Sequence, residues 1–439
     1  VLEDKTVRCW GYGVGYSGDP VTVEGLVSVE KLDAGGGHTC VVLTDSSVRC
    51  WGSNNYGELG NCGVKRFRFP VVVENLKNAI SISVNGAHSC AVLYDKRIKC
   101  WGFNGDGALG NGSSIDSGLA VEVRDISEAL EVSSGRDHTC ALMSNKTVKC
   151  WGTNTNGQLG DGTYKFTNLP VSVSGLENII GISVGGCVYG SHSVALHKDG
   201  YIFYWGCFKG YEQYDQNCST SGYHSNLPFK VEGINNAKLV SSGGEHTCAI
   251  LSDDSMVCFG NNWYGQLGDG TKTSSSIPVK VNIRFNARAI AAGYNYTCAL
   301  LEDGSIRCWG INNSGQLGNG TKSNSNLPTS VVGIDSALGI SAGYNHTCAV
   351  LSNGKVMCWG ENNDYQLANG VHRDSSLPLE VNGITNAIAV SVGGNEYTSH
   401  SCALLRDGSV RCWGNNDHGQ LGLGFLSAFS QNPVPVIVE

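Results

Sequence analysis

The chain has 439 residues, of which 60 are Gly and 19 are Cys, while only 15% are charged. Hydrophobic residues make up 41% of the sequence, which is enough for a large core and excludes a disordered chain, since disorder combines low hydrophobicity with high net charge. A net charge of -8 disfavours a phosphate-binding surface, because nucleic-acid affinity comes mainly from Lys and Arg. We therefore expect no nucleic-acid partner.

The sequence begins with half of a unit that recurs along its whole length, and we assign residues 1–25 to a half blade. Residues 1–9 align with residues 42–50, so the chain starts within a hairpin and the partner of Cys9 would precede Val1. An unfinished sheet exposes strand edges that invite pairing with another chain. Either upstream residues complete a ninth blade, or the outer strands of the half blade pair with another chain. We favour this region as the place of self-assembly.

Eight complete repeats follow the half repeat, and each predicts four short strands. In one repeat we expect strands at 288–292, 296–301, 305–309 and 327–332, with Gly304 in a three-residue hairpin loop where a left-handed backbone is required. Such units bury both faces only by stacking side by side, which predicts a single all-β domain over 1–439, a β-propeller of four-stranded blades. The second strands are centred on Cys40, Cys90, Cys140, Val194, Cys248, Cys298, Cys348 and Cys402.

Seven of the repeats carry two cysteines ten positions apart. In a hairpin with a three-residue loop these positions face each other, at the Cα separation of about 4.5–5.5 Å that a disulfide can span. In the irregular repeat at 181–233, Val194 and Tyr204 replace both cysteines together, as expected for a bonded pair. The predicted pairs are Cys40–Cys50, Cys90–Cys100, Cys140–Cys150, Cys248–Cys258, Cys298–Cys308, Cys348–Cys358 and Cys402–Cys412.

The compartment follows from these cysteines. A zinc site is the alternative use, but it needs four ligands, and each repeat offers two Cys and one nearby His. We therefore predict no metal and no cofactor. Seven disulfides require an oxidising environment, so we expect a secreted protein that is extracellular or at the cell surface. No signal peptide or transmembrane run is visible, and a cleaved signal would precede Val1.

Five cysteines remain outside this pattern. Three of them lie in the irregular repeat, where a Cys187–Cys207 or a Cys207–Cys218 bridge is open. The odd total leaves at least one thiol free, or bonded to an absent segment or a second chain. The candidates for intermolecular bonds are Cys9 and Cys62.

The repeat resembles a known family. Its pattern is Gly-x-x-His-Thr-Cys, a hairpin, and then Cys-Trp-Gly-x-Asn-x-x-Gly-Gln-Leu-Gly-x-Gly, which is similar to the repeat of the regulator of chromosome condensation. The resemblance covers essentially the whole chain and implies a propeller, most often with seven blades. Members include a nuclear exchange factor, ligase-associated domains and secreted beta-lactamase inhibitors, so the fold implies no single function. The loop side chains on which the exchange factor depends have no match here.

Two sets of repeated residues are candidates for sites. A ring of histidines could bind a metal or sense pH, but we expect structural hydrogen bonds from His38, His88, His138, His192, His246, His346 and His400, and from Tyr296 in the remaining repeat. Tryptophans could stack on sugars, but their fixed place on the third strand favours packing between blades. They are Trp10, Trp51, Trp101, Trp151, Trp205, Trp309, Trp359 and Trp413.

Residues outside the repeat pattern are better candidates for recognition. The aromatic candidates for a binding surface are Tyr211, Tyr214, Tyr223 and Trp263. Glycan acceptors are expected in turns or loops, at Asn111, Asn145, Asn217, Asn312 and Asn319. Asn295 and Asn345 share one repeat phase before a buried strand, so we regard their sequons as accidental.

No nucleophile, paired-carboxylate or phosphate-binding pattern rises above chance, so we do not expect an enzyme. The sequence favours a structural or protein-interaction propeller, such as a subunit of an extracellular filament or coat, with a protein partner or itself. The alternative is a soluble extracellular binding protein, either a protein inhibitor or a lectin. A metal enzyme built on the histidine ring is the least favoured hypothesis.

Overall fold

The computed structural model describes residues 76–187, 190–207, 224–395 and 398–422, with Val73 and, by backbone alone, the strands within 8–72 and 430–435. The described residues form β-strands joined by turns and contain no helix, in agreement with the all-β prediction. The chain forms two compact units. The smaller unit comprises 1–66 and 425–439, and the larger unit comprises 67–424.

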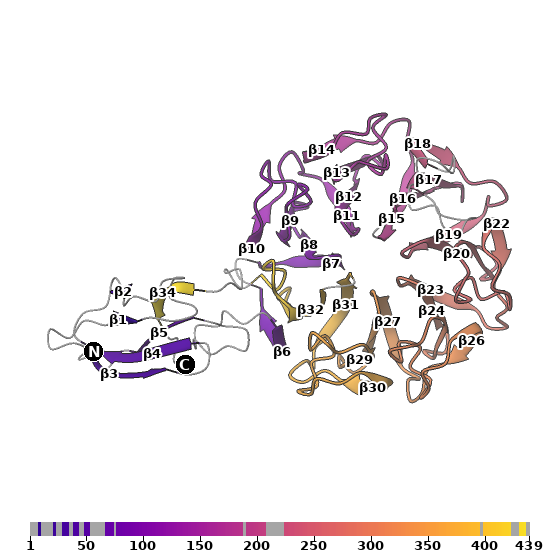
Figure 1. Ribbon diagram of the computed structural model, residues 1–439. Coiled ribbons are helices and arrows are strands. Elements are labelled where there is room, and N and C mark those ends of the chain that lie inside the picture. The colour runs from indigo at the N-terminus through magenta and orange to yellow at the C-terminus, as the bar shows by residue number, and fades with distance from the viewer. Residues whose placement is uncertain are drawn as a thin grey trace. The chain divides into compact units, whose positions relative to one another are not determined.

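The larger unit is a ring of seven four-stranded blades (Figure 1). The first three consist of β7 (Ala79–Asn85), β8 (His88–Leu93), β9 (Ile98–Gly102) and β10 (Ser117–Glu122); β11 (Ala129–Ser134), β12 (His138–Met143), β13 (Val148–Gly152) and β14 (Thr167–Ser172); and β15 (Ile179–Cys187), β16 (Gly190–His197), β17 (Ile202–Cys207) and β18 (His224–Lys230). The next three consist of β19 (Ala237–Ser242), β20 (His246–Leu251), β21 (Met256–Gly260) and β22 (Ser275–Lys280); β23 (Ala287–Ala292), β24 (Tyr296–Leu301), β25 (Ile306–Gly310) and β26 (Ser325–Ser330); and β27 (Ala337–Ala342), β28 (His346–Leu351), β29 (Val356–Gly360) and β30 (Ser375–Glu380).

The seventh blade closes the ring. It combines β31 (Ala387–Gly394), β32 (Ser399–Leu405) and β33 (Val410–Asn415) with β6 (Arg66–Val72), a strand from the other end of the chain. The backbone N–H of Val73 also donates to the Val410 carbonyl at 3.0 Å. A propeller of eight complete repeats plus a half repeat is therefore wrong, because β6 takes the outer position of the seventh blade and closes the circle there.

The remaining repeat forms a sheet of the smaller unit. There β3 (Val29–Ala34), β4 (His38–Leu43) and β5 (Val48–Gly52) pair with β34 (Ser430–Pro435). The strands β1 (Arg8–Cys9) and β2 (Val21–Thr22), within the predicted half blade, form a separate two-stranded sheet. The two outer strands are thus exchanged relative to sequence order, since β6 follows β5 along the chain and β34 follows β33.

The blade hairpins bring the paired cysteines together. In β24 and β25, Cys298 faces Cys308, and Gly304 has a φ of 82° in the three-residue loop, as predicted. Six of the seven predicted pairs are disulfides in the structure, with Cα separations of 4.0–4.1 Å. The side chains of the seventh pair, Cys40 and Cys50, lie outside the described residues. The bonded cysteines are buried in the blade cores, so each disulfide links the two strands of a hairpin within the core.

Candidate functional site

In six of the blades, a tight turn after the third strand contacts the next blade. In the turn before β26, the Leu317 N–H donates to Asn312 Oδ1 at 2.9 Å, which fixes the loop. The Gln316 carbonyl accepts from Trp359 Nε1 at 2.9 Å and from the Thr347 hydroxyl at 3.0 Å, both on the next blade. The loop of one blade is therefore hydrogen-bonded to the core of its neighbour.

The same junction occurs six times, and we call these contacts the leucine junctions. Gly318, at the end of the turn, has a φ of 64°, and a Cβ there would lie 2.7 Å from Trp359 Nε1, so a larger residue would push the blades apart. The leucines are fully buried against tryptophans whose indole N–H groups all donate to the turn. The leucines are Leu109, Leu159, Leu267, Leu317, Leu367 and Leu421, and their tryptophans are Trp151, Trp205, Trp309, Trp359, Trp413 and Trp101.

The histidines form a closed circle of hydrogen bonds around the ring. Each His Nε2 lies against the hydroxyl of a Ser or Thr on the next blade, and His400 closes the circle onto Ser89 at 2.8 Å. Tyr296 takes one position, with its hydroxyl 3.0 Å from Thr347. The other contacts are His88–Thr139, His138–Ser193, His192–Thr247, His246–Thr297 and His346–Ser401.

These histidines are neutral structural residues. Where the partner hydroxyl donates its proton to a turn carbonyl, as Thr297 does to Gln266 at 2.8 Å, it accepts from the imidazole, which places the proton on Nε2. Burial lowers the pKa of His88 to about 4. It lowers the pKa values of the other five, His138, His192, His246, His346 and His400, to about 3. The structural interpretation of the ring therefore fits better than a neutral-pH switch.

One junction differs from the other six. It lies between the blades β15–β18 and β19–β22, and we call it the aromatic junction. The segment that connects its third and fourth strands, 208–223, contains no leucine, and Phe259 stands where the other junctions have tryptophan. Tyr204 and Val194 occupy the position of the missing disulfide. The core cluster here combines Tyr204 and Phe259 with aliphatic residues such as Val231.

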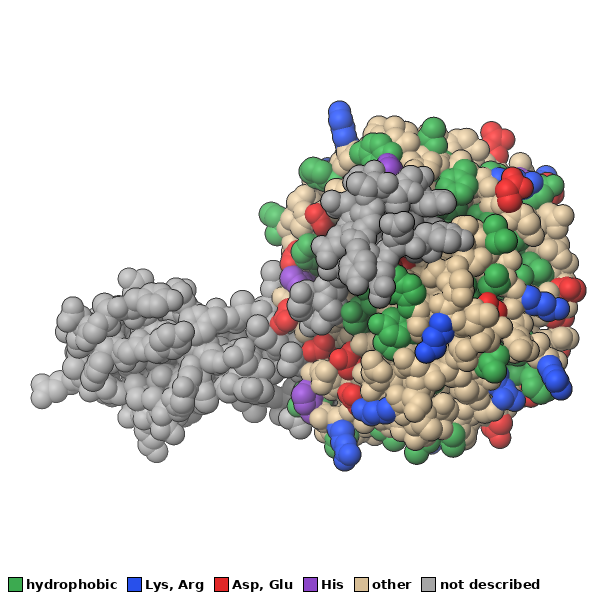
Figure 2. Space-filling view, turned by 45° about the vertical axis from the view of Figure 1, so that its right-hand side comes forward, with side chains coloured by type: hydrophobic (Ala, Val, Ile, Leu, Met, Phe, Trp, Pro, Cys, Tyr) green, Lys and Arg blue, Asp and Glu red, His purple; other side chains and the backbone are tan. Residues whose placement is uncertain are grey.

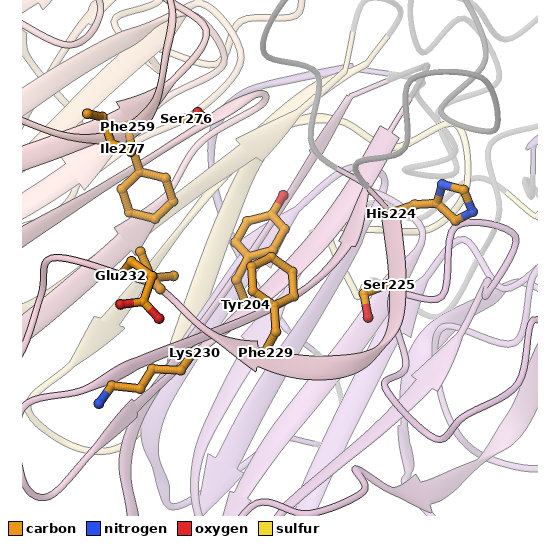
Figure 3. A pocket seen from close by; sticks show the side chains of 10 residues that line it. Tyr204, His224, Ser225, Phe229, Lys230, Glu232, Phe259, Ser276 and Ile277 are labelled. Atoms are coloured by element: carbon orange, nitrogen blue, oxygen red, sulfur yellow. The ribbon is translucent and has the colours of Figure 1, made fainter.

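A pocket of about 470 Å³ opens at the aromatic junction. Its floor consists of Tyr204 and Phe259, which come from the two blades and whose ring centroids are 6.5 Å apart. Phe229 packs beside Tyr204, at 5.6 Å between centroids, and Ile277 lies at the rim. Figure 3 shows these rings around one space, with Lys230 and Glu232 to one side and His224 to the other. The pocket is apolar at its floor and polar at its ends.

Exposed hydrophobic residues continue from the pocket onto the neighbouring blade. Ile277 is 67% exposed and Phe229 is 49% exposed. The ring of Tyr164, which is 48% exposed, lies 6.1 Å from the ring of His224 at the pocket. Phe166, two residues further on, is 64% exposed. Figure 2 shows hydrophobic side chains interspersed with charged ones on the visible face of the larger unit.

Sequence reasoning missed this patch, although the repeats contain its signal. At the position of Phe166, four other repeats carry a polar side chain that accepts from the backbone N–H of the loop asparagine, at 2.7–3.1 Å. These residues are Asp116, Ser274, Asn324 and Asp374. Phe166 accepts no hydrogen bond and is largely exposed, so this repeat lacks the acceptor that the other four carry at this surface position.

The predicted recognition residues fall in different places. Trp263 is exposed, and its backbone N–H donates to Asn261 Oδ1 at 3.0 Å in the next loop, but it does not line the pocket. The other three candidates, Tyr211, Tyr214 and Tyr223, lie outside the described residues. They stay predictions.

The predicted glycan acceptors also differ. Asn145 is exposed in a hairpin turn, and Asn111 and Asn319 are half-buried. Asn312 is fully buried and holds the loop through both ends of its amide, so we withdraw it as an acceptor. Asn217 lies outside the described residues.

The unassigned cysteines are partly described. Cys207 is disulfide-bonded, as both of its predicted bridges require. The side chains of Cys9, Cys62, Cys187 and Cys218 lie outside the described residues, so their pairing stays a prediction. Within the described ranges no cluster of His, Cys, Asp and Glu has an arrangement suited to a metal ion. No described helix has the length and apolar character to cross a membrane.

A model of the RCC1-like domain matches residues 119–398, more than half of the chain. Models of the single regulator of chromosome condensation repeat match 29–58, 79–108 and 397–420, and 45–92. No curated protein matches the sequence.

Solved structures share the fold at low identity. Prp20p from Saccharomyces cerevisiae, described with its binding to Gsp1p and histones, has a TM-score of 0.62 at 22% identity, over 78% of this chain and 84% of that chain. Yeast RCC1 in complex with Kap60 has a TM-score of 0.63 at 22% identity, over 85% and 90%. Human WBSCR16 has a TM-score of 0.63 at 21% identity, over 77% and 90%.

Proposed function

The chain belongs to the family of RCC1-like domains, and we propose that it is a secreted or cell-surface propeller that binds other proteins. The observation that carries this proposal is the set of six disulfides inside the blades. The cytosol keeps thiols reduced, whereas stable structural disulfides accumulate in oxidising compartments. The exposed aromatic patch supports protein binding rather than catalysis.

The bridges have a physical role in such a compartment. The cysteines of all six bridges are nearly or fully buried in the cores. Closing a hairpin of this length stabilises the folded state by about 2.5–3 kcal/mol per bridge in the chain-entropy model. A protein that leaves the cell gains this stability, whereas a cytosolic protein would carry the same residues as free thiols.

The solved relatives support a protein-binding use of the fold. Prp20p is described with Gsp1p and histones, and yeast RCC1 is bound to Kap60. A shared fold transfers no particular partner. We therefore propose a protein partner for this chain and do not assign it the partners of those relatives.

The test is the thiol count of protein isolated from its native source. Intact mass is measured after alkylation without and with reductant, so that each bridge adds two alkyl groups only after reduction. We expect at least six bridges in the unreduced material. Alkylation of these cysteines without reductant would contradict an oxidising compartment, whatever the protein binds.

A second candidate is a subunit of an extracellular filament or coat. Five of the seven innermost strands expose an aliphatic residue at their second position, where the other two carry Lys238 and Arg288. The five are Ile80, Leu130, Ile180, Leu338 and Ile388. Exposed apolar side chains that recur at one strand position support association as a candidate function. Sedimentation velocity tests this candidate, because a monomer at all concentrations would contradict it.

A further inference from the structure

We propose that the outer edge of β10 is a pairing surface for the β10 strand of a second copy of this chain. β10 is the outermost strand of the first blade, at the rim of the ring (Figure 1). The two β10 strands pair antiparallel around a twofold axis. The inference goes beyond the proposed function, because it depends neither on the compartment nor on a partner protein.

The backbone of β10 has hydrogen-bonding groups on both of its sides. On the inner side, the Val123 N–H donates to the Ile98 carbonyl of β9 at 3.0 Å. Successive residues of a strand direct their N–H and carbonyl groups to opposite sides. The backbone groups of Ala120 and Glu122 therefore point to the outer edge, and none of the strands that the structure describes pairs with β10 there.

The other outer strands of the ring are blocked at this position. Proline has no N–H, so in a sheet it is tolerated where the strand faces away from the ladder, and it protects an edge from pairing with another chain. Each of the other six outer strands has a proline three residues before the valine whose N–H donates to the inner neighbour. These residues are Pro70, Pro170, Pro228, Pro278, Pro328 and Pro378. β10 has Ala120 instead, and so keeps the donor.

Apolar side chains flank this unblocked edge. Leu119 in β10 is 36% exposed, and Ile115, two residues before the strand, is 75% exposed. Four other repeats carry a polar residue at the position of Ile115, and these are Lys165, Thr273, Ser323 and Arg373. Charged side chains and prolines are common protections of a sheet edge. The first blade lacks both the proline and the polar residue of the other repeats.

The edge is complementary to itself, which favours a second copy as the occupant. In the twofold pairing, the outward backbone groups of Ala120 face those of Glu122 of the second copy, and the reverse holds at the other end. Val121, which is half-buried, then faces Val121 of the second copy, and β-branched apolar pairs stabilise neighbouring strands. Like charges do not meet directly, because Glu122 faces an alanine, and the Glu122 carboxylate is also paired with Arg97 of its own copy at 2.8 Å.

This kind of interface makes a closed dimer. A twofold axis uses the same surface on both copies, and such dimers are the commonest soluble oligomers. The β10 pairing is satisfied once two copies have met, so it does not by itself build a filament.

The experiment measures the dissociation constant of the dimer by sedimentation velocity on the full oxidised chain. Ala120→Pro removes the outward N–H from both copies, and the fold should tolerate it, because Pro328 occupies the equivalent position in β26. Ala120→Gly keeps the N–H and is the matched control. We expect Ala120→Pro to raise the dissociation constant about tenfold or more, since each copy loses a hydrogen bond, and Ala120→Gly to change it less than about threefold.

A second pair of variants leaves the backbone unchanged. Leu119→Lys places a charge at the edge of β10 and should also raise the dissociation constant about tenfold, because an edge lysine opposes pairing. Leu327→Lys is its control, since Leu327 has the equivalent position in β26 and is 41% exposed. We expect Leu327→Lys to leave the dimer unchanged. Circular dichroism of all four variants verifies that each is folded.

Photo-crosslinking locates the interface. A photoreactive amino acid replaces Val121, and copies labelled with ¹⁴N and ¹⁵N are mixed before irradiation, so that a link between two copies has a mixed isotopic mass. We expect such links to join the two β10 strands. The same residue placed at Thr329, the equivalent position of β26, should give none.

Three outcomes would overturn the proposal. A wild-type chain that stays monomeric at all concentrations would exclude the dimer. Dimers that are unaffected by both Ala120→Pro and Leu119→Lys would place association elsewhere, such as the half blade at 1–25, and would leave the association candidate standing. Crosslinks from position 121 within one copy would mean that the chain covers this edge itself. None of these results depends on the disulfide count, so the dimer and the compartment can fail separately.

Discussion

The leucine junctions and the aromatic junction join blades of the same design in two different ways. A leucine junction buries a leucine, a glycine-ended turn and an indole N–H hydrogen bond, as at Leu317 and Trp359. The aromatic junction has Tyr204 and Phe259 instead, and keeps a pocket. Because six junctions and their disulfides already close the ring, one junction can change its chemistry without loss of the fold.

The changes at the aromatic junction are coupled. The sequence of the aromatic junction lacks the leucine-containing turn whose carbonyl accepts from an indole at the other junctions. The indole donor is missing as well, since Phe259 replaces tryptophan. A buried indole N–H without an acceptor would cost about 1–3 kcal/mol. Likewise Val194 and Tyr204 replace both members of a cysteine pair. The comparison teaches that junction residues change as sets, and each set can be tested separately.

The largest expected effect is acid unfolding, which both kinds of junction share. The folded-state pKa values of the six described ring histidines lie near 3–4, below the unfolded value of about 6.5. Their neutral form therefore stabilises the fold fully above pH 6.5, and this contribution is lost as pH falls toward 4, by up to about 1.4 kcal/mol per histidine and pH unit.

Denaturant unfolding between pH 7 and 4 measures this dependence. Two carboxyls act in the opposite direction and are outweighed: burial raises the pKa of Glu131 to about 7, and it also raises the pKa of Glu361. His346→Gln should remove about one proton from the uptake on unfolding. A stability that stays flat between pH 6.5 and 4.5 would contradict the buried neutral ring.

A truncated leucine should be the next largest effect. Leu317→Ala leaves a cavity at a leucine junction and should lower the free energy of unfolding by about 2–5 kcal/mol. Ile277→Ala at the exposed rim of the aromatic junction should change it by about 0.5 kcal/mol or less. Chemical denaturation of the two variants in parallel gives the difference, and equal losses would erase the distinction between the junctions.

The indole hydrogen bond should contribute less. Trp309→Phe removes a donor to the Gln266 carbonyl, which lies at 2.9 Å, and should cost about 1–2 kcal/mol. Phe259→Trp, the reverse change at the aromatic junction, should also destabilise, because it adds a buried donor where the turn motif is missing. Thermal melts compare the two, and a stabilised Phe259→Trp variant would show that an acceptor is present after all.

The smallest expected effect is a gain. Phe166→Asp restores the acceptor that Asp116 and Asp374 provide in other repeats, and should raise the free energy of unfolding by about 0.5–1.5 kcal/mol. Phe166→Leu, which accepts no hydrogen bond, is the control and should bring no gain. Equal stabilities of the two variants, measured in urea, would show that an acceptor at this position contributes nothing to stability.

The repeat made much of this molecule predictable. The ten-residue cysteine spacing, the hairpin at Gly304 and the core role of the tryptophans all follow from local geometry. The structure agrees with them for the six described tryptophans of the repeat, while Trp10 and Trp51 lie outside the described residues. The number of blades does not follow, because β6 and β34 are outer strands of similar pattern, and sequence alone does not say which of them pairs with β33.

The pocket was harder to predict than the fold. It arises from what two blades omit, and an omission appears in the sequence only when repeats are compared position by position. Phe229 was visible as a departure, but an aromatic residue in a strand gave no sign that its ring packs beside Tyr204 at the pocket. Trp263, the more conspicuous candidate, lies outside the pocket lining.

The intact mass of the native protein, measured after alkylation without and with reductant, tests the central claim most directly. The account predicts that the cysteines of at least six bridges take up alkyl groups only after reduction. Alkylation of the same cysteines without reductant would contradict it.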